Sequence, residues 1–193
     1  AAVMKNELRE QLKRQLKAER QIVIAGFQAD GMPEKLLRSL RQSVDAVLTT
    51  AWHEARLPAN TALVGVGGYG RGELFPYSDV DVLILLGQSP DEDTRHRLEE
   101  LVQLLWDLGL EIGHSIRTVD ECMSEAEADI TVQTSLLEAR LVHGSQTLFD
   151  ELEHVLASGE PALGRARRVL LQRQPDTAPE ECFFDYVHQP IRN

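Results

Sequence analysis

The sequence predicts an α+β fold, in which short strands in the middle of the chain are flanked by amphipathic helical segments. Strands are indicated at residues 62–66, 80–86 and 111–119, where apolar or alternating segments are bounded by turn residues. Apolar side chains recur at helical spacing before the first of these segments and after the last one. Both ends of the chain are therefore expected to be helical, with a small sheet between them.

These patterns divide the chain into an N-terminal helical segment (residues 1–58), a central core (59–143) and a C-terminal part (144–193). The C-terminal part is expected to contain helices and then a loop tail, because residues 174–193 have weak periodicity and several prolines. Over the whole chain, helices are predicted at residues 4–25, 33–54, 91–108, 120–128, 130–142, 146–157 and 161–172.

Composition and charge narrow the class of protein. The net charge of -11 argues against a general nucleic-acid binder, because such proteins need a basic surface to displace counterions. The longest unbroken apolar run, residues 82–86, is far too short to span a bilayer, and the first residues lack a signal-peptide pattern, so secretion is not expected. Cys122 and Cys182 lie far apart and have no metal-ligand spacing. We therefore expect a cytoplasmic protein with reduced thiols and with neither a nucleic-acid nor a membrane partner.

The most informative feature is a pair of aspartates, Asp79 and Asp81, at the start of the second predicted strand. Residues i and i+2 of a strand point to the same face, so the two carboxylates should project side by side. Such a pair is repulsive unless a cation lies between its members. Mg²⁺ accepts one or two protein carboxylates of this kind, and Mn²⁺ is the alternative ion. The competing interpretation is a turn with solvated aspartates.

Glycines follow the first predicted strand at Gly67 and Gly68, where they allow a backbone to approach a phosphate closely. A tight turn alone is the simpler interpretation. Gly65, Gly67 and Gly70 also match a dinucleotide-binding spacing, but Pro76 and an acidic strand arrive where that motif needs a long helix. The glycine run does not end in Gly-Lys-Ser/Thr, so a P-loop is excluded as well.

A glycine pair, ten intervening residues and an Asp-hydrophobic-Asp strand together resemble the DNA polymerase β-like nucleotidyltransferase superfamily. The fuller string Gly67-Gly-Tyr-Gly-Arg-Gly-Glu-Leu-Phe-Pro-Tyr-Ser-Asp-Val-Asp81 resembles more narrowly the bifunctional uridylyltransferase/uridylyl-removing enzymes that modify PII nitrogen-signalling proteins. The stretches at 109–118 and 129–141 support this resemblance, which covers roughly residues 36–168. It implies a nucleotidyltransferase fold, with a mixed sheet flanked by helices and an active site on one face.

The resemblance also implies roles for individual residues. Asp79 and Asp81 would be catalytic, holding metal ions that bridge the triphosphate and activate the attacking hydroxyl. Gly67 and Gly68 would cradle the β and γ phosphates. Arg71 would neutralise phosphate charge, unless it is a solvent-facing loop arginine.

Two further positions are less well defined. Ser78 is expected to cap a turn beside the carboxylates, within the nucleotide-binding segment. Members of the superfamily usually add a third carboxylate, for which Glu111, Asp120 and Asp129 are the candidates. His114 should face away from Glu111 and is expected to be a hydrogen-bonded core residue.

The implied reaction is transfer of UMP from UTP to a tyrosine of a PII-type protein, with release of pyrophosphate. The alternatives are nucleotidyl transfer, for example of AMP, to another protein or small molecule, and a catalytically silent nucleotide-binding regulatory module. Family members continue into a hydrolase domain marked by a His-Asp doublet and into glutamine-sensing domains. The sequence has no His-Asp doublet, so we expect a fragment or a shorter relative that neither removes UMP nor responds to glutamine.

Overall fold

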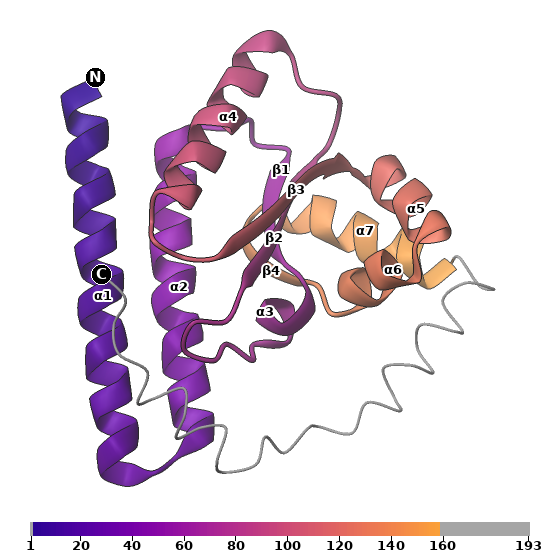
Figure 1. Ribbon diagram of the computed structural model, residues 1–193. Coiled ribbons are helices and arrows are strands. Elements are labelled where there is room, and N and C mark those ends of the chain that lie inside the picture. The colour runs from indigo at the N-terminus through magenta and orange to yellow at the C-terminus, as the bar shows by residue number, and fades with distance from the viewer. Residues whose placement is uncertain (1, 159–193) are drawn as a thin grey trace.

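The computed structural model describes residues 2–158, and it contains a four-stranded mixed sheet with the strand order β3-β2-β1-β4 (Figure 1). The strands are β1 (Thr61–Gly65), β2 (Val80–Leu86), β3 (Ile112–Thr118) and β4 (Arg140–Gly144). β2 and β3 are parallel, and β1 is antiparallel to both β2 and β4. The predicted α+β class is confirmed. The helix predicted at 161–172 and the tail at 174–193 lie outside the described residues.

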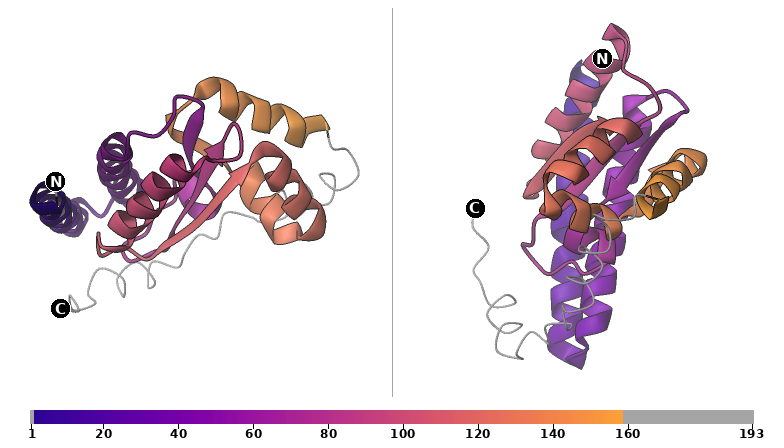
Figure 2. Two further views of the ribbon diagram at one scale, coloured as in Figure 1. Left: turned by 90° about the horizontal axis from the view of Figure 1, so that it is seen from above. Right: turned by 90° about the vertical axis from the view of Figure 1, so that its right-hand side faces the viewer.

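Helices cover both faces of this sheet (Figure 2). The helices α1 (Ala2–Asp30), α2 (Pro33–Ala55) and α4 (Glu92–Trp106) lie on one side. On the other side lie α5 (Val119–Ala128), α6 (Ile130–Leu137) and α7 (Gln146–Ser158). The remaining helix, α3 (Gly67–Arg71), is a short turn between β1 and β2. None of the described helices has both the length and the apolar character needed to cross a bilayer.

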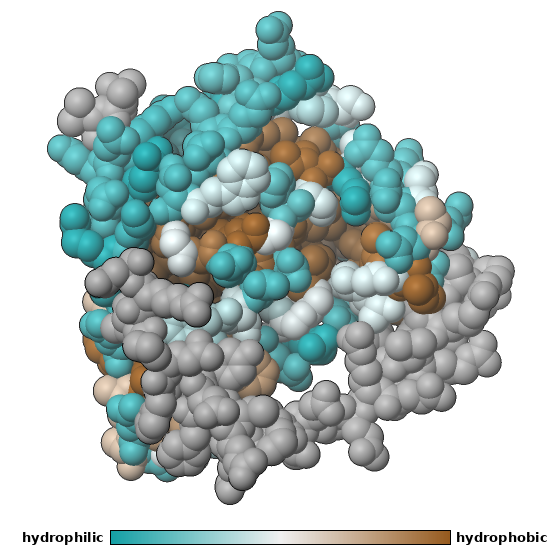
Figure 3. All heavy atoms as spheres, in the orientation of Figure 1, coloured by the Kyte–Doolittle hydropathy of each residue, from teal (hydrophilic) through white to brown (hydrophobic). Residues whose placement is uncertain are grey.

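The pleat of β2 determines which of its side chains enter which core. Val80, Val82 and Ile84 pack against α1, α2 and α4, whereas Leu83 and Leu85 pack against α5 and α7. Asp81 shares the face of Leu83 and Leu85, but it is exposed at the end of the strand. The apolar residues of β2 therefore hold the strand between the two cores, whereas Asp81 at its start stays accessible. In Figure 3, apolar atoms gather at the centre of the visible face, and hydrophilic residues surround them.

The prediction of a helix over residues 130–142 is wrong in its second half, because α6 ends at Leu137 and β4 begins at Arg140. β4 pairs with the edge of β1, with Leu63 opposite His143 and Gly65 opposite Arg140. These pairings supply the backbone hydrogen bonds that a helix would otherwise provide. The partner strand lies far away in sequence, so apolar spacing within residues 130–142 contains no sign of it.

Substitution of two glycines by alanine tests this packing, and the two substitutions should change the free energy of unfolding in opposite directions. Gly144 has φ +107, and a β-carbon there would lie 2.6 Å from the Thr61 carbonyl oxygen of β1. We expect Gly144→Ala to lower the free energy of unfolding by about 1–3 kcal/mol, because both the backbone and the strand pairing are strained. Gly26 lies within α1 with open space around it, so Gly26→Ala should raise this free energy by about 0.5–1 kcal/mol.

Both values are measured by urea unfolding of the two variants beside the wild type. Equal effects of the two substitutions would contradict the β1–β4 pairing.

Candidate active site

The site begins where β1 ends and the chain turns into α3. Gly67 has φ +59, a left-handed conformation that a glycine adopts without strain. The turn is joined to β2 by a hydrogen bond, because the Val66 amide donates to the Asp81 carbonyl oxygen at 3.0 Å. Gly70 has a different reason to be glycine, since a β-carbon there would lie 2.2 Å from the Glu138 carbonyl oxygen. The glycine run therefore combines one left-handed turn with one close backbone contact.

Asp81 lies directly beside this turn, on a surface that glycines keep open. A β-carbon at Gly67 would lie 3.8 Å from its Oδ2 atom, and one at Gly113 would lie 2.4 Å from its Oδ1 atom. Gly113 is the residue of β3 paired with Asp81 in the sheet. Val80 is 1% exposed, whereas Asp79 and Asp81 on either side of it are exposed. The structure thus places Asp81 beside the glycine turn and Asp79 next to Asp81 at the start of β2.

The electrostatics of the pair favour a cation. Desolvation, and then the charge of Asp79, raise the pKa of Asp81 above its usual value. A divalent ion would relieve this repulsion, and oxygen donors of this type match the preference of Mg²⁺ and Mn²⁺. Two protein carboxylates suffice for Mg²⁺ when water and phosphate oxygens complete the coordination shell. The residues present therefore fit a divalent metal bound together with a nucleotide.

The candidates for a third carboxylate do not complete a larger metal cluster. Asp129 caps α6, since its side chain accepts a hydrogen bond of 2.7 Å from the Thr131 amide. Asp120 lies in the first turn of α5, and the backbone oxygen of Glu111 accepts a bond of 2.8 Å from the Val80 amide. Within residues 2–158, no three His, Cys, Asp or Glu side chains are grouped as metal ligands.

Arg71 lies beside Gly68 and is held by two carboxylates. Its guanidinium is 2.7 Å from Glu138 Oε1 and 3.1 Å from Glu73 Oε2. Burial lowers the pKa of Arg71, but the bonds to Glu138 and then to Glu73 outweigh it and raise this pKa. Arg71 Nη2 lies 3.6 Å from the position of a β-carbon at Gly68. The guanidinium is therefore placed near the glycine turn, and Glu138 and Glu73 already balance its charge.

A second arginine, Arg41 of α2, also reaches the turn and was not anticipated from the sequence. Its Nη1 atom lies 3.1 Å from the position of a β-carbon at Gly72, which has φ +81. Its buried Nε atom has no hydrogen-bond partner among the described residues. Helical spacing placed Arg41 on α2, but nothing in that spacing indicates that α2 packs beside α3.

A hydrogen-bonded group of Tyr69, Asp45 and Arg140 fixes α3 in place, and sequence reasoning missed it. The Tyr69 hydroxyl donates to Asp45, while Arg140 Nη1 and Nη2 donate to the two Asp45 oxygens at 2.9 and 3.1 Å. Arg140 Nη2 also donates to the Tyr69 carbonyl oxygen at 3.3 Å. Burial, and then Asp45, raise the pKa of Tyr69, so its phenol remains a neutral donor. The group joins α2 and β4 to the short helix of the site.

The structure places Ser78 in a turn and His114 on the surface. The backbone amide of Ser78 closes a turn by donating to the Phe75 carbonyl oxygen at 3.1 Å, whereas no hydrogen bond to its hydroxyl is present in the described part of the chain. The prediction that His114 is a core residue is wrong. His114 is exposed, and its ring lies edge-on to the exposed Trp106, with 5.3 Å between ring centroids. His114 pairs with Val82 at the edge strand of the sheet, and its ring neighbour, Trp106, is itself exposed.

Comparison with known proteins agrees with this geometry. Residues 51–136 match the family model described as "Nucleotidyltransferase domain", so this part of the chain is a nucleotidyltransferase domain. More narrowly, over most of its length the chain is similar to curated bifunctional uridylyltransferase/uridylyl-removing enzymes. The enzyme of that name from Cupriavidus pinatubonensis is 54% identical over 162 residues, which are 83% of this chain and 18% of that enzyme.

Two further relatives have the same name. The enzyme from Cupriavidus metallidurans is 53% identical over 144 residues (75% of this chain and 17% of the relative), and that from Bordetella avium is 47% identical over 165 residues (84% and 19%). The chain therefore spans less than a fifth of the length of these relatives. Among solved structures, one titled "Crystal structure of the toxin-antitoxin with AMP-PNP" covers 66% of this chain and 94% of its own, with 16% identity and a TM-score of 0.42.

The space around Asp81 leads to a test at Gly113. We expect Gly113→Ala to displace the Asp81 carboxylate and to weaken Mn²⁺ binding about tenfold or more, as loss of a supporting contact at metal sites commonly does. Ser115→Ala, two residues along the same face of β3, is the matched control. Calorimetric titration with Mn²⁺ measures the affinity, and circular dichroism checks the fold. Wild-type affinity in a folded Gly113→Ala variant would contradict the placement of the carboxylate.

The raised pKa of Asp81 predicts a dependence of stability on pH. The unfolded chain ionises this carboxyl at a lower pH than the folded protein does, so ionisation of Asp81 opposes folding as pH rises above about 4. Without metal, Asp81→Asn should therefore have a higher Tm than wild type at pH 7. The difference should disappear below about pH 4, where both side chains are neutral.

Thermal melts of both proteins across this pH range provide the measurement. Addition of Mg²⁺ should raise the Tm of the wild type more than that of Asp81→Asn, because only the wild type keeps both carboxylates. A wild type that is more stable than the variant at pH 7 without metal would show that the pair is not repulsive.

Proposed function

We propose that this chain transfers UMP from UTP to a tyrosine hydroxyl of a PII-type signal protein and releases pyrophosphate. The observation that carries the proposal is the position of Asp81, next to Asp79 and between Gly67 and Gly113, in a nucleotidyltransferase domain. Relatives with about half of their matched residues identical are named for uridylyl transfer and uridylyl removal. Mg²⁺, or Mn²⁺ in its place, is the proposed cofactor.

The residues of the chain would mainly bind, orient and neutralise. Asp79 and Asp81 would hold the metal, which when bound supplies positive charge to the triphosphate and to the attacking hydroxyl. Gly67 and Gly68 would let the backbone approach the phosphates, because no side chain blocks the turn. Arg71 would exchange one carboxylate partner for a phosphate oxygen. Chemistry of this kind requires positioning more than covalent participation, which suits a site without an activated nucleophile.

The N-terminal helical segment (1–58) would act with the core (59–143) rather than as a separate unit. α2 supplies Asp45, which is bonded to Tyr69 of α3 and Arg140 of β4. Arg41 of the same helix contacts Gly72. The third part, 144–193, contributes α7, which packs against the sheet through Leu148 and neighbouring residues.

The remaining proposals concern location and partners. A cytoplasmic location suits a protein that uses UTP and a soluble signal protein. The net charge of -11 disfavours nucleic acid as a partner, and it makes a metal ion necessary if a triphosphate is to bind beside two carboxylates.

Transfer of label from α-labelled UTP to a purified PII-type protein tests the function. Wild type with Mg²⁺ should label the acceptor, and Asp79→Asn or Asp81→Asn should reduce the rate about a hundredfold or more, because metal-held charge is worth several kcal/mol in the transition state. Both variants should remain folded, since the two side chains are exposed. Gly68→Val should raise KM for UTP and lower kcat.

Three controls define the result. Substitution of the acceptor tyrosine by phenylalanine should abolish labelling, and ATP in place of UTP tests for adenylyl transfer. Arg38→Gln, at an exposed position of α2, should behave as wild type. Near-normal rates in both aspartate variants would refute the assignment of the site, and nucleotide binding without any transfer would favour a silent regulatory module.

A further inference from the structure

Tyr77, in the loop that leads from α3 to the carboxylate pair, has an unusual backbone conformation. Its φ is +67, and the only other residue besides glycine with a positive φ among the described residues is Arg56. The Ser78 amide donates to the Phe75 carbonyl oxygen at 3.1 Å, so Pro76 and Tyr77 are the central residues of a β-turn. Proline restricts its own φ to about -65°, and with a positive φ after it the turn is type II.

The third position of a type II turn is normally glycine, because a side chain there is strained. A glycine would reverse the chain at this position with less strain than a tyrosine. Contacts with its surroundings must therefore hold the tyrosine in this conformation. These contacts are expected to involve the ring, because the ring is the part of the residue that a glycine lacks.

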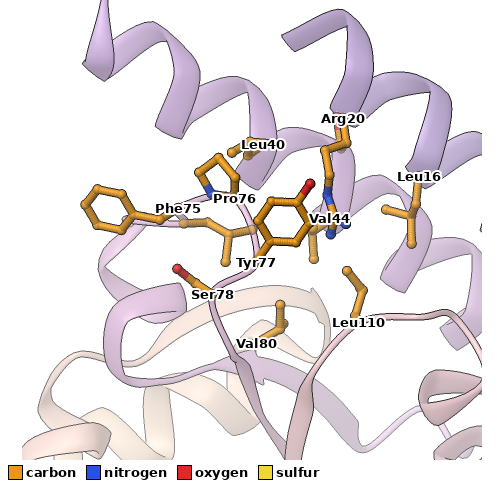
Figure 4. Close-up of a pocket in the computed structure, with 12 residues that line it drawn as sticks. Leu16, Arg20, Leu40, Val44, Phe75, Pro76, Tyr77, Ser78, Val80 and Leu110 are labelled. Carbon is orange, nitrogen blue, oxygen red and sulfur yellow. The ribbon is translucent and has the colours of Figure 1, made fainter. Parts of the chain in front are cut away.

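Arg20 of α1 holds that ring. The centre of its guanidinium lies 5.0 Å from the centroid of the Tyr77 ring, within the range of a cation–π contact (Figure 4). The two side chains meet at a cavity of about 20 Å³, which is lined by residues of α1, α2, the loop 74–78 and the start of β2, among them Leu16, Val44 and Val80. Such a cavity holds about one water molecule, so it is part of the packing and too small for a nucleotide.

Arg20 forms no ion pair with a carboxylate in the described part of the chain, and burial lowers its pKa. Its contact with Tyr77 therefore replaces the salt bridge that a half-buried arginine usually has. The contact also crosses a large distance in sequence, from the N-terminal helix to the loop of the site.

The turn ends immediately before the carboxylates. Ser78 is the last residue of the turn, Asp79 follows it, and the Val80 amide is then fixed by its 2.8 Å bond to the Glu111 carbonyl oxygen. Asp79 is thus held between a strand on one side and the strained turn on the other. We propose that Tyr77, held by Arg20, is a positioning residue for Asp79, which makes α1 a supporting part of the metal site. The proposal rests on the metal-binding role given to Asp79 and Asp81 above.

The test compares four variants: Tyr77→Gly, Tyr77→Phe, Arg20→Gln and the double variant Tyr77→Gly/Arg20→Gln. Tyr77→Gly keeps the turn, which favours glycine, and removes the ring. Tyr77→Phe keeps the ring and serves as the conservative rescue. Arg14→Gln, at an exposed position of the same helix, is the matched control. Mn²⁺ affinity is measured by calorimetry without nucleotide, and kcat, KM for UTP and Tm are measured on the same preparations.

Tyr77→Gly and Arg20→Gln should each weaken Mn²⁺ binding by about three- to tenfold, the range that loss of one cation–π contact allows. The double variant should resemble the single ones, because both substitutions break the same contact. kcat at limiting Mn²⁺ should fall, whereas KM for UTP at saturating metal should change little. Tyr77→Phe and Arg14→Gln should bind Mn²⁺ as wild type does.

Wild-type Mn²⁺ affinity in a folded Tyr77→Gly variant would overturn the proposal. A loss of Mn²⁺ affinity that accompanies a lower Tm, and that also occurs in Tyr77→Phe, would overturn it as well. The Tyr77 ring would then stabilise the fold without positioning Asp79. Asp81→Asn is included as a reference, because it distinguishes an error in the proposed metal site from an error in the role given to Tyr77. If it binds Mn²⁺ as wild type does, the metal site itself is wrong. If it loses binding while Tyr77→Gly does not, only the role of Tyr77 is wrong.

Discussion

The structure of the site depends on the space around the Asp81 carboxylate. This side chain lies where β-carbons at Gly67 and Gly113 would meet or approach its oxygens, so the backbones on both sides come close to it. Partial desolvation, and then the charge of the neighbouring Asp79, raise the pKa of Asp81. A cation is the natural partner of such a group, and the glycine turn beside it keeps the approach open to phosphate.

Other contacts hold the two sides of this space. Tyr69, Asp45 and Arg140 join the short helix α3 to α2 and β4, through a bidentate ion pair and a buried phenol. Because α3 is too short to be stable alone, these long-range bonds must hold it. Arg71 is held separately by Glu138 and Glu73. The site is thus preorganised by side chains that do not themselves touch the carboxylate pair.

The acidic character of the chain gives the proposed metal a further role. With a net charge of -11 and two carboxylates in the candidate site, the chain would repel a triphosphate if no cation bound with it. Arg71 reduces this repulsion only in part, because two carboxylates already balance its charge. Arg41 is less strongly held, since its buried Nε atom has no hydrogen-bond partner among the described residues.

The sequence by itself determined the local features: the bounds of β2, the place of β1 to within one residue, the amphipathic α2, and the neighbouring aspartates Asp79 and Asp81. Each depends on periodicity or turn chemistry within a few residues. Only the tertiary structure decided that residues 140–144 form a strand, and that Asp45 meets Arg140 across 95 positions of sequence. The partners of such contacts come from packed elements distant in the chain, and no local pattern contains their positions. The same reason hid the contact of Arg20 with Tyr77.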